Sequence, residues 1–376
     1  MQVKDIIDKL YSTTNASREE LLFLLDNLSE ENKEYLIEKA HRVAVENYSK
    51  NVYIRGLIEF TNYCIRDCKY CGIRKSNHKA DRYRLSIDEI LECADIGDKL
   101  GYKTYVLQGG EDSYFTDEKM VEIIKKIKEK YPGNAITLSL GERSYKSYKM
   151  MFNAGADRYL LRHETASKDL YESLHPNGSF ENRIQCLKNL KEIGYQVGAG
   201  FMVGLPNQSN KNLIDDLIFL KELNPHMCGI GPFIPHKDTP LANEKGGTLE
   251  KTITMLALVR LMLPKILLPA TTALGSVDPL GREKGLKAGA NVVMPNLSPT
   301  NVREKYSLYD GKICTGDEAA ECRVCIERRI NAAGFNLEIT RGDSLALSNT
   351  EKENINSKLV DNKNNGIKLD NIVLIN

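Results

Sequence analysis

The chain has 376 residues, of which 41% are hydrophobic and 27% are charged, so it can bury a large core as one barrel or as two domains. Its 52 Lys and Arg balance 51 Asp and Glu, which gives no argument for nucleic acid or a membrane surface as a partner. It contains no apolar run of 18 residues, and its first residues are charged where a signal peptide would be apolar. We therefore expect a cytoplasmic protein.

Residues 1–50 are predicted to be helical. Ser17 and Glu20 form a capping-box pattern ahead of a leucine-rich run, and a second amphipathic run covers residues 32–48. Because these helices precede the first strand, we expect them to cover one end of the body that follows.

From residue 51 onward, short apolar runs alternate with helical patterns. The expected strands are 53–61, 103–108, 135–140, 157–162, 196–203, 227–231, 266–272 and 290–294. The expected helices are 86–100, 117–130, 144–154, 181–193, 210–222, 249–263 and 279–288. Eight strands, each paired with a helix, predict an α/β fold with a complete (β/α)8 TIM-type barrel over residues 51–300. The active site of such a barrel lies at the carboxyl ends of its strands.

Three cysteines follow the first expected strand, in the run FTNYCIRDCKYCG. Cys64, Cys68 and Cys71 have the spacing C-x3-C-x2-C, and thiolates at this spacing on a tight loop can converge on one iron–sulfur cluster. Three ligands would leave one iron of a [4Fe–4S] cube open for a small chelating molecule. Zinc is the alternative, but zinc usually takes four ligands in paired C-x2-C spacing, and only the loosely placed His78 is close in sequence.

This run resembles the cluster-binding segment of the radical S-adenosylmethionine (SAM) superfamily, with Tyr70 before the last cysteine and Gly72 after it. In that superfamily, SAM chelates the open iron and is cleaved reductively to a 5′-deoxyadenosyl radical. The resemblance therefore implies a [4Fe–4S] cluster and SAM as cofactors, Cys64, Cys68 and Cys71 as catalytic ligands, and a reduced electron donor such as flavodoxin or ferredoxin.

The resemblance also suggests SAM contacts at other strand ends. The run 108–111, QGGE, looks like the superfamily's GGE motif, in which glycines let the backbone approach a ligand. Glu164 could accept both ribose hydroxyls, Arg183 could bind the methionine carboxylate, and Met202 could pack on the adenine. A surface arginine and a core methionine are the competing interpretations of the last two. The expected set is Tyr70, Gln108, Gly109, Gly110, Ser139, Glu164, Arg183 and Met202.

A pocket for a small anion or carboxylate is expected next to the SAM site. Arg162, in the run DRYLLRHET, would be costly to bury without an anionic partner. Arg158 is expected near the same barrel mouth, although a solvated or paired charge is its alternative interpretation. The expected lining residues are Thr137, Arg158, Arg162, Met227, Thr271, Thr272 and Met294.

A second cysteine group lies in residues 301–347, which we expect to form a C-terminal extension. Cys314, Cys322 and Cys325 have the spacing C-x7-C-x2-C and predict a second iron–sulfur site, of the [2Fe–2S] type. Three reduced thiols without a metal are the alternative, because a three-thiolate site needs an outside ligand and can fill incompletely. The remaining cysteines are expected to be ordinary buried thiols: Cys93, Cys186 and Cys228.

Together these features resemble the biotin-synthase-like radical SAM maturases of the [FeFe]-hydrogenase H-cluster, over roughly residues 1–345. The resemblance is carried by the runs CIRDCKYCGIR, LQGGED, YLLRHET, GFMVGLPNQ, PATTALGS and VVMPNLSPTNVREKYSLYD and by the second cysteine group. It implies a small organometallic or cysteine-derived substrate on the way to the di-iron subcluster, and the other maturation proteins as partners. It also adds Gln108 and Tyr309 to the cavity and makes the second cluster accessory.

Two other interpretations stay open. One is another enzyme of the superfamily: a methylornithine synthase, which normally lacks the second cysteine group, or a biotin synthase, which holds a [2Fe–2S] cluster inside its barrel. The other is a non-catalytic iron–sulfur carrier, which would need no nucleoside pocket. Residues 348–376 lie outside the resemblance, and eight of these 29 residues are Asn, so we expect a largely disordered tail.

Overall fold

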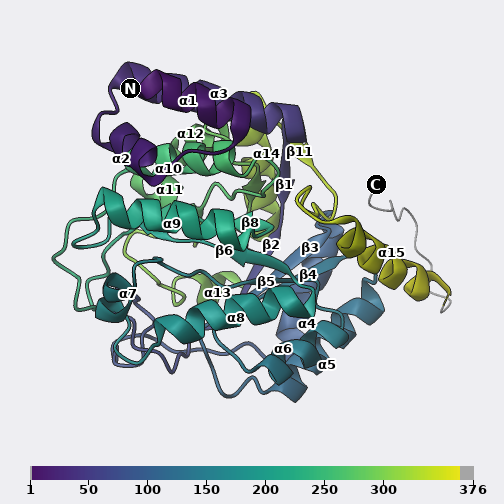
Figure 1. Ribbon diagram of the computed structural model, residues 1–376. Helices are drawn as coiled ribbons and strands as arrows, with labels where there is room; N and C mark the ends of the chain where they lie inside the picture. The colour runs from purple at the N-terminus through teal and green to yellow at the C-terminus, as the bar shows by residue number, and fades with distance from the viewer. Residues whose placement is uncertain (1, 365–376) are drawn as a thin grey trace.

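A computed structural model of the protein describes residues 2–364 (Figure 1). Three helices lead into the barrel: α1 (Val3–Thr13), α2 (Arg18–Asp26) and α3 (Glu30–Tyr48). The predicted capping box of Ser17 and Glu20 is present at the start of α2. In Figure 1, α1 and α3 lie together over one end of the molecule, where α3 packs on α10 (Leu249–Met262). Because α10 lies between α3 and the barrel, residues all round it are buried.

The strands form a closed parallel ring. The first strand is β1 (Asn51–Ile54) continued by β2 (Gly56–Thr61), and β2 opens the sheet order β2-β3-β4-β5-β6-β8. The bounds of the others are Thr104–Gly109 for β3, Ala135–Ser139 for β4, Arg158–Leu160 for β5, Gln196–Ala199 for β6 and Met227–Cys228 for β8.

The ring closes through residues that form single parallel bridges. Met227 of β8 bridges to Leu267, and Pro269 bridges to Val292. Val292 begins β10 (Val292–Val293), which pairs in parallel with β1. The eight predicted strand positions are thus all present, the seventh as the irregular segment 266–270, and the predicted complete (β/α)8 barrel is confirmed.

The outer helices are α4 (Ile87–Lys99), α5 (Asp117–Lys130), α6 (Tyr145–Asn153), α8 (Phe180–Ile193), α9 (Asn210–Leu223) and α12 (Gly281–Lys287). Ser and Thr side chains cap many of them: Ser86, Ser144 and Ser209 each accept a hydrogen bond from a backbone N–H of the following first turn. The short elements α7 (Lys168–Leu174), β7 (Met202–Val203), β9 (Gly231–Pro232), α11 (Thr272–Val277) and α13 (Thr300–Arg303) lie in connections.

Two elements after the barrel return to its amino end. Helix α14 (Ala319–Ala332) is followed by β11 (Asn336–Glu338), which pairs in parallel with β1. Figure 1 shows β11 beside β1. No strand pattern is visible in the sequence here because β11 has only three residues. The division of the chain at residues 50, 300 and 347 stays a prediction.

Helix α15 (Asn349–Asn364) differs from the expected disordered tail. Ser348 and Glu351 exchange hydrogen bonds between their side chains and backbone N–H groups, as in a capping box, and Leu359 is 3% exposed. The Asn-rich composition hid this start signal. Residues 365–376 lie outside the described part.

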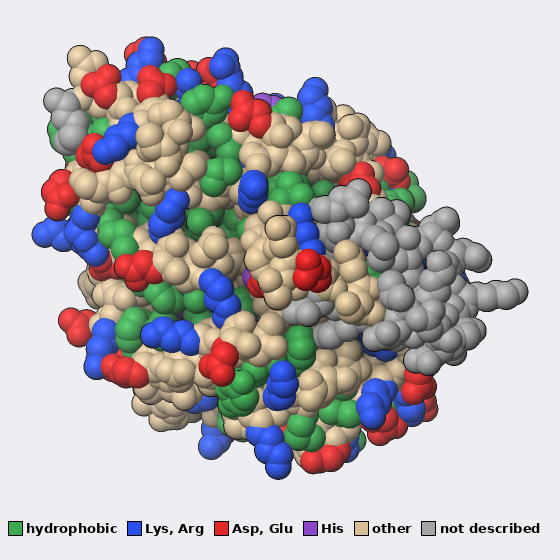
Figure 2. All heavy atoms as spheres, turned by 45° about the vertical axis from the view of Figure 1, so that its right-hand side comes forward, with side chains coloured by type: hydrophobic (Ala, Val, Ile, Leu, Met, Phe, Trp, Pro, Cys, Tyr) green, Lys and Arg blue, Asp and Glu red, His purple; other side chains and the backbone are tan. Residues whose placement is uncertain are grey.

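On the face shown in Figure 2, basic and acidic side chains are interspersed, as expected for a net charge of +1. Among residues 2–364, none of the helices has the length and apolar character needed to cross a membrane.

Candidate active site at the carboxyl ends of the strands

The loop after β2 carries the first cysteine group. Cys64, Cys68 and Cys71 are half-buried free thiols. Burial, and then the neighbouring Cys64, raise the pKa of Cys68 to about 12, and burial with Cys68 and Cys64 raises that of Cys71. The three sulfurs are therefore close enough to affect one another electrostatically, in a site where charged thiolates need positive partners.

The choice between a cluster and a single ion stays a prediction. Among residues 2–364, no group of three or more His, Cys, Asp and Glu is arranged around one metal position. The spacing of Cys64, Cys68 and Cys71 favours a cluster, in which each thiolate binds a different iron.

A single arginine holds the cysteine loop in shape. The guanidinium of Arg82 donates to four backbone carbonyls that lie on both sides of the cysteines. The acceptors are the carbonyls of Asn62 at 2.5 Å, Ile73 at 2.8 Å, Arg74 at 2.7 Å and Asn77 at 3.0 Å. Because these bonds link the start of the loop to its end, Arg82 fixes the backbone that presents the thiols.

Two glycines are required by close packing around this loop. A Cβ on Gly72 would lie under 3.0 Å from the Ser307 carbonyl and the ring of His236. A Cβ on Gly110 would lie equally close to the Tyr63 carbonyl and to Cys64. The second glycine of the QGGE run therefore packs against the cysteine loop, and its contact with SAM stays a prediction.

Tyr70 anchors the loop to α7 and the residue after it. Its hydroxyl lies 2.9 Å from Nε2 of His175, whose Nδ1 lies 2.7 Å from the Tyr171 carbonyl. Since a carbonyl can only accept, Nδ1 carries the ring proton and the Tyr70 hydroxyl donates to Nε2. Burial, the largest cause, lowers the pKa of His175 to about 4, which favours this neutral form.

Charged side chains form a network beside the cysteines. Arg183 donates from Nε to Glu142 at 2.7 Å, and Glu142 also accepts from Arg66 at 3.0 Å. The Arg183 side chain is only 10% exposed, so the alternative of an ordinary surface arginine is wrong. Its Nη1 donates to the Arg162 carbonyl at 2.6 Å, and none of the hydrogen bonds among the described residues uses its Nη2. Arg183 can therefore still bind a carboxylate through Nη2.

Glu164 has the features of a binding residue. Its φ of 64° lies in the left-handed region, which is costly for a residue with a Cβ and is found most often at functional sites. Its N–H donates to the Gly200 carbonyl, and its carbonyl accepts from Met202. Its buried Oε2 lies 3.2 Å from Nη2 of Arg162, in an ion pair in which neither atom makes a hydrogen bond among the described residues. This carboxylate can still accept from a ligand hydroxyl.

Other expected SAM residues lie at the same end of neighbouring strands. Gln108 and Ser139 are paired in register on β3 and β4, and Gln108 is also in register with Glu59 of β2. Met202 is buried in a small cluster against which Tyr70 packs. The structure thus brings the expected SAM residues together around the mouth, while their contacts with SAM stay predictions.

The expected substrate residues divide between the two ends of the barrel. Near the mouth, the buried Nε of Arg162 has no hydrogen bond among the described residues, whereas its Nη2 is paired with Glu164. Thr272 accepts from Arg282 at 3.2 Å and lines, with Met294, the cavity of the second cysteine group, and Thr271 is the N-cap residue of α11. Burial raises the pKa of Tyr309 to about 12.

The expected position of Arg158 at the mouth is wrong. Arg158 is the first residue of β5, and its guanidinium pairs with Asp343 at 2.6 Å at the amino end of the barrel. Met227 is likewise the first residue of β8, with its sulfur 3.0 Å from Nη1 of Arg55. Thr137 pairs in register with Arg158 and therefore lies at the same level, toward the amino end of the barrel. Sequence alone could not supply Asp343, which comes from the returning C-terminal segment.

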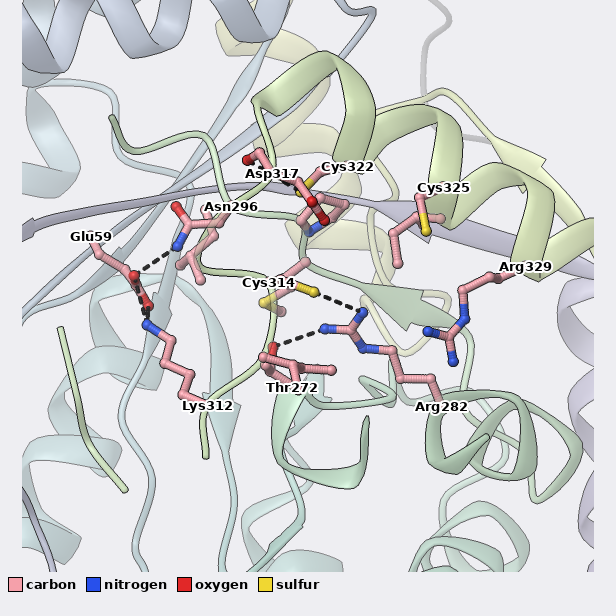
Figure 3. Close-up of a pocket in the computed structure, with 15 residues that line it drawn as sticks. Glu59, Thr272, Arg282, Asn296, Lys312, Cys314, Asp317, Cys322, Cys325 and Arg329 are labelled. Atoms are coloured by element: carbon pink, nitrogen blue, oxygen red, sulfur yellow. Dashed lines mark hydrogen bonds and ion pairs between the residues drawn. The ribbon is translucent and has the colours of Figure 1, made fainter. Parts of the chain in front are cut away.

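The second cysteine group lines this same cavity, which has a volume of about 50 Å³ (Figure 3). Cys322 and Cys325 come from α14, and Cys314 lies opposite them with a φ of 63°. Arg282 Nη1 lies 3.7 Å from the Cys314 sulfur, and Arg303 Nη1 lies 3.9 Å from the Cys322 sulfur. Burial, and then Cys314, raise the pKa of Cys322. The three thiols thus share one arginine-flanked pocket, and a cluster there stays a prediction.

Several residues that position the site were not found from the sequence. They include the loop clamp Arg82, the network residues Arg66 and Glu142, and the buried pair of Glu59 and Lys312 in Figure 3. Arg82 and Arg66 stand in a loop rich in Lys and Arg, where nothing distinguishes a clamp from a solvated charge.

Comparisons with known proteins identify the family. Residues 58–220 match the Radical SAM superfamily. The chain is 47% identical over 334 residues to the [FeFe] hydrogenase maturase subunit HydE of Thermotoga maritima, covering 89% of this chain and 95% of that protein. It is 30% identical over 305 residues to the 3-methylornithine synthase of Methanosarcina acetivorans, covering 81% and 86%.

A solved structure agrees with this placement. The crystal structure of methylornithine synthase (PylB) superposes with a TM-score of 0.78 at 26% identity, over 89% of this chain and 97% of that one. The superfamily uses a [4Fe–4S] cluster and SAM, and the loop described above carries three free cysteines within the matched residues. The chain is therefore a radical SAM enzyme that belongs to the family of the [FeFe]-hydrogenase maturase HydE.

Proposed function

We propose that this enzyme acts in the assembly of the [FeFe]-hydrogenase H-cluster, by cleaving SAM at a cluster held by Cys64, Cys68 and Cys71. The observation that carries the proposal is the 47% identity to HydE over nearly the whole length of that protein. The cysteine loop and the QGGE run lie in the barrel of this chain, and the second cysteine group lies in the segment that follows the barrel.

The cluster, once bound, would supply one electron to the SAM sulfonium, and cleavage would give a 5′-deoxyadenosyl radical. The residues of this chain bind and orient the nucleotide. Glu164 offers its carboxylate to the ribose hydroxyls, and Arg183 offers Nη2 to the methionine carboxylate. Gln108 and Ser139 lie side by side at the mouth, where they can complete the SAM site.

The substrate is a small organometallic or cysteine-derived molecule with negative charge. Support comes from Arg162, whose buried Nε has no acceptor among the described residues, a cost that an anionic ligand would remove. Its position next to Glu164 keeps the substrate close to the nucleotide. Thr271, Thr272, Met294 and Tyr309 complete the proposed lining.

The finer features of the proposal concern the second site, the partners and the compartment. Cys314, Cys322 and Cys325 would hold an accessory [2Fe–2S] cluster, in a pocket where Arg282 and Arg303 lie beside the sulfurs of Cys314 and Cys322. A reduced flavodoxin or ferredoxin would supply electrons, and the other maturation proteins would receive the product. All nine cysteines are free thiols, which suits a reducing cytoplasm.

The other interpretations have less support. The identity to methylornithine synthase is 30%, against 47% to HydE. A non-catalytic carrier would have no use for the unpaired buried Nε of Arg162 or for the strained backbone of Glu164.

Maturation of an apo-hydrogenase tests the proposal. The chain is expressed with the other maturation proteins and an [FeFe]-hydrogenase in a host that lacks its own maturase of this type. Hydrogen evolution should appear with the wild-type chain and not with Cys68→Ala. An inactive hydrogenase, together with normal SAM cleavage by the same chain, would show that the enzyme serves another pathway.

A further inference from the structure

Apolar side chains are exposed around the first cysteine. Tyr63 and Ile65 flank Cys64 in sequence and are 36% and 54% exposed, and Tyr114 is 49% exposed. The N–H of Ile65 donates to the Glu111 carbonyl at 2.9 Å, so the cysteine loop and the loop after β3 form one continuous rim. Large apolar side chains gathered in this way on a surface commonly mark an interaction site.

Cations are arranged over and beside these rings. The guanidinium of Arg84 lies 3.8 Å from the centre of the Tyr63 ring and 4.8 Å from that of Tyr114. The ammonium of Lys119 lies 3.3 Å from the Tyr114 ring. Lys75 lies at the other side of Ile65, because its N–H donates to the Arg66 carbonyl at 2.8 Å. We call Tyr63, Ile65, Lys75, Arg84, Tyr114 and Lys119 the rim patch.

The patch lies in a markedly basic part of a nearly neutral chain. Residues 62–85 contain seven Lys and Arg but only two Asp, whereas the whole chain has a net charge of +1. Some of these cations are neutralised, as Arg84 is by Asp112 at 2.7 Å. Lys75 and Lys119 have no acidic partner among the described residues. The patch therefore presents an apolar centre with an uncompensated positive edge.

We propose that the rim patch docks a small acidic one-electron carrier protein. The inference rests on the proposed function, because SAM cleavage consumes one electron for each turnover. In this step the reduced carrier loses one electron and the cluster held by Cys64 gains it, and no bond in either protein breaks. A carrier on the patch would sit against the two residues that flank Cys64, which makes the path to the cluster short.

Charge complementarity selects this partner. Basic edges around an apolar centre attract an acidic surface and speed its association, and the attraction weakens as salt screens it. Salt does not screen apolar contacts, so the apolar centre still contributes to binding when the salt concentration is raised.

Binding of an acidic bacterial flavodoxin tests the proposal without relying on catalysis. The dissociation constant of oxidised flavodoxin is measured by calorimetry for the wild-type chain, Ile65→Glu and Lys75→Glu. Each variant should bind about tenfold more weakly, because it places a negative charge on the docking surface. Lys188→Glu, on the outer wall at α8, is the matched control and should bind as the wild type does.

Two further measurements complete the test. Wild-type affinity should fall as sodium chloride is raised, and 5′-deoxyadenosine formation driven by dithionite should be the same in Lys75→Glu and the wild type. Unchanged flavodoxin binding in both variants would overturn the proposal. The proposal would also be overturned if these two variants bound flavodoxin normally but no longer supported hydrogenase maturation, because the patch would then bind another protein. If dithionite drove no SAM cleavage in the wild type, the proposed function would fail, and the binding data would still decide the docking surface.

Discussion

The ammonium of Lys312 lies 2.7 Å from Oε1 of Glu59 and 2.8 Å from Oε2, although 253 residues separate the two in sequence. Glu59 belongs to β2, which leads into the first cysteine loop, and Lys312 stands two residues before Cys314. Asn296 also donates to Glu59, at 2.7 Å. One buried ion pair therefore joins the barrel strand that leads to the first cysteine group with the segment that carries the second.

Removing the cation of this pair should destabilise the protein strongly. In Lys312→Met, the Glu59 side chain, which is 2% exposed, loses its main partner. We expect the free energy of unfolding of the apo-protein to fall by about 3 kcal/mol, measured by chemical denaturation. The double variant Glu59→Gln with Lys312→Met should recover much of this loss. A single variant as stable as the wild type would contradict the role of the pair.

Replacing the loop clamp should impair cluster assembly. In Arg82→Lys, one ammonium cannot reach all four carbonyls that the guanidinium binds, so the ends of the cysteine loop lose their link. Iron content after anaerobic reconstitution should fall to less than about half of the wild-type value, while the far-UV circular dichroism is unchanged. Arg42→Lys, on an exposed part of α3, serves as the control. Full iron loading of Arg82→Lys would show that the clamp is dispensable.

The second cysteine group should be separable from SAM cleavage. Cys322 lies on α14, in a pocket distinct from the first cysteine loop. Cys322→Ala should lose about two iron atoms per chain, as expected for a [2Fe–2S] cluster, and keep most of its 5′-deoxyadenosine formation. Iron analysis and product chromatography on the same samples check both results. An inactive variant with an intact first cluster would mean that the second site is not accessory.

Helix α15 should loosen in acid. His226 accepts from the Val197 N–H through Nδ1, so its Nε2 carries a proton toward Glu351, 3.2 Å away. This hydrogen bond, the largest cause, lowers the pKa of Glu351 from 4.5 to about 2. Because the folded carboxyl binds a proton less readily than the unfolded one, the stabilisation is complete above about pH 4.5 and is lost as the pH falls toward 2.

The size of this effect is modest, because solvent reaches the carboxylate. We expect the pair to contribute about 1 kcal/mol or less to the docking of α15. Hydrogen exchange in α15 of the apo-protein should accelerate between pH 5 and pH 3, after correction for the intrinsic rate, and Glu351→Gln should remove most of the difference. Equal pH dependence in both proteins would exclude the pair as its origin.

The repeating parts of this fold could be predicted from the sequence. The alternation of apolar runs and helical patterns located every strand position of the ring, and helices such as α5 and α8 begin and end within a residue or so of the expected positions. Local patterns sufficed because helices such as α5 and α8 have their own side-chain N-caps and one buried face. They did not suffice for β11, whose three residues owe their pairing to the neighbouring β1.

The candidate site could be predicted where its residues are close together in sequence. It could not be predicted where a side chain pairs with a residue far along the chain. Three cysteines on one loop identify themselves by spacing. Arg158 was misplaced because its partner Asp343 lies 185 residues further along the chain. An arginine at a strand end can serve a substrate or an ion pair, and only the returning segment decides which.

The measurement that tests the account most directly is the response of the first cluster to SAM. The anaerobically reconstituted and reduced wild-type enzyme is examined by electron paramagnetic resonance before and after SAM is added, and 5′-deoxyadenosine is then assayed. We predict that SAM changes the cluster signal and that 5′-deoxyadenosine forms, and that Cys68→Ala shows neither. An unchanged signal without product in the wild type, or full cleavage by Cys68→Ala, would contradict the assignment of these three thiols.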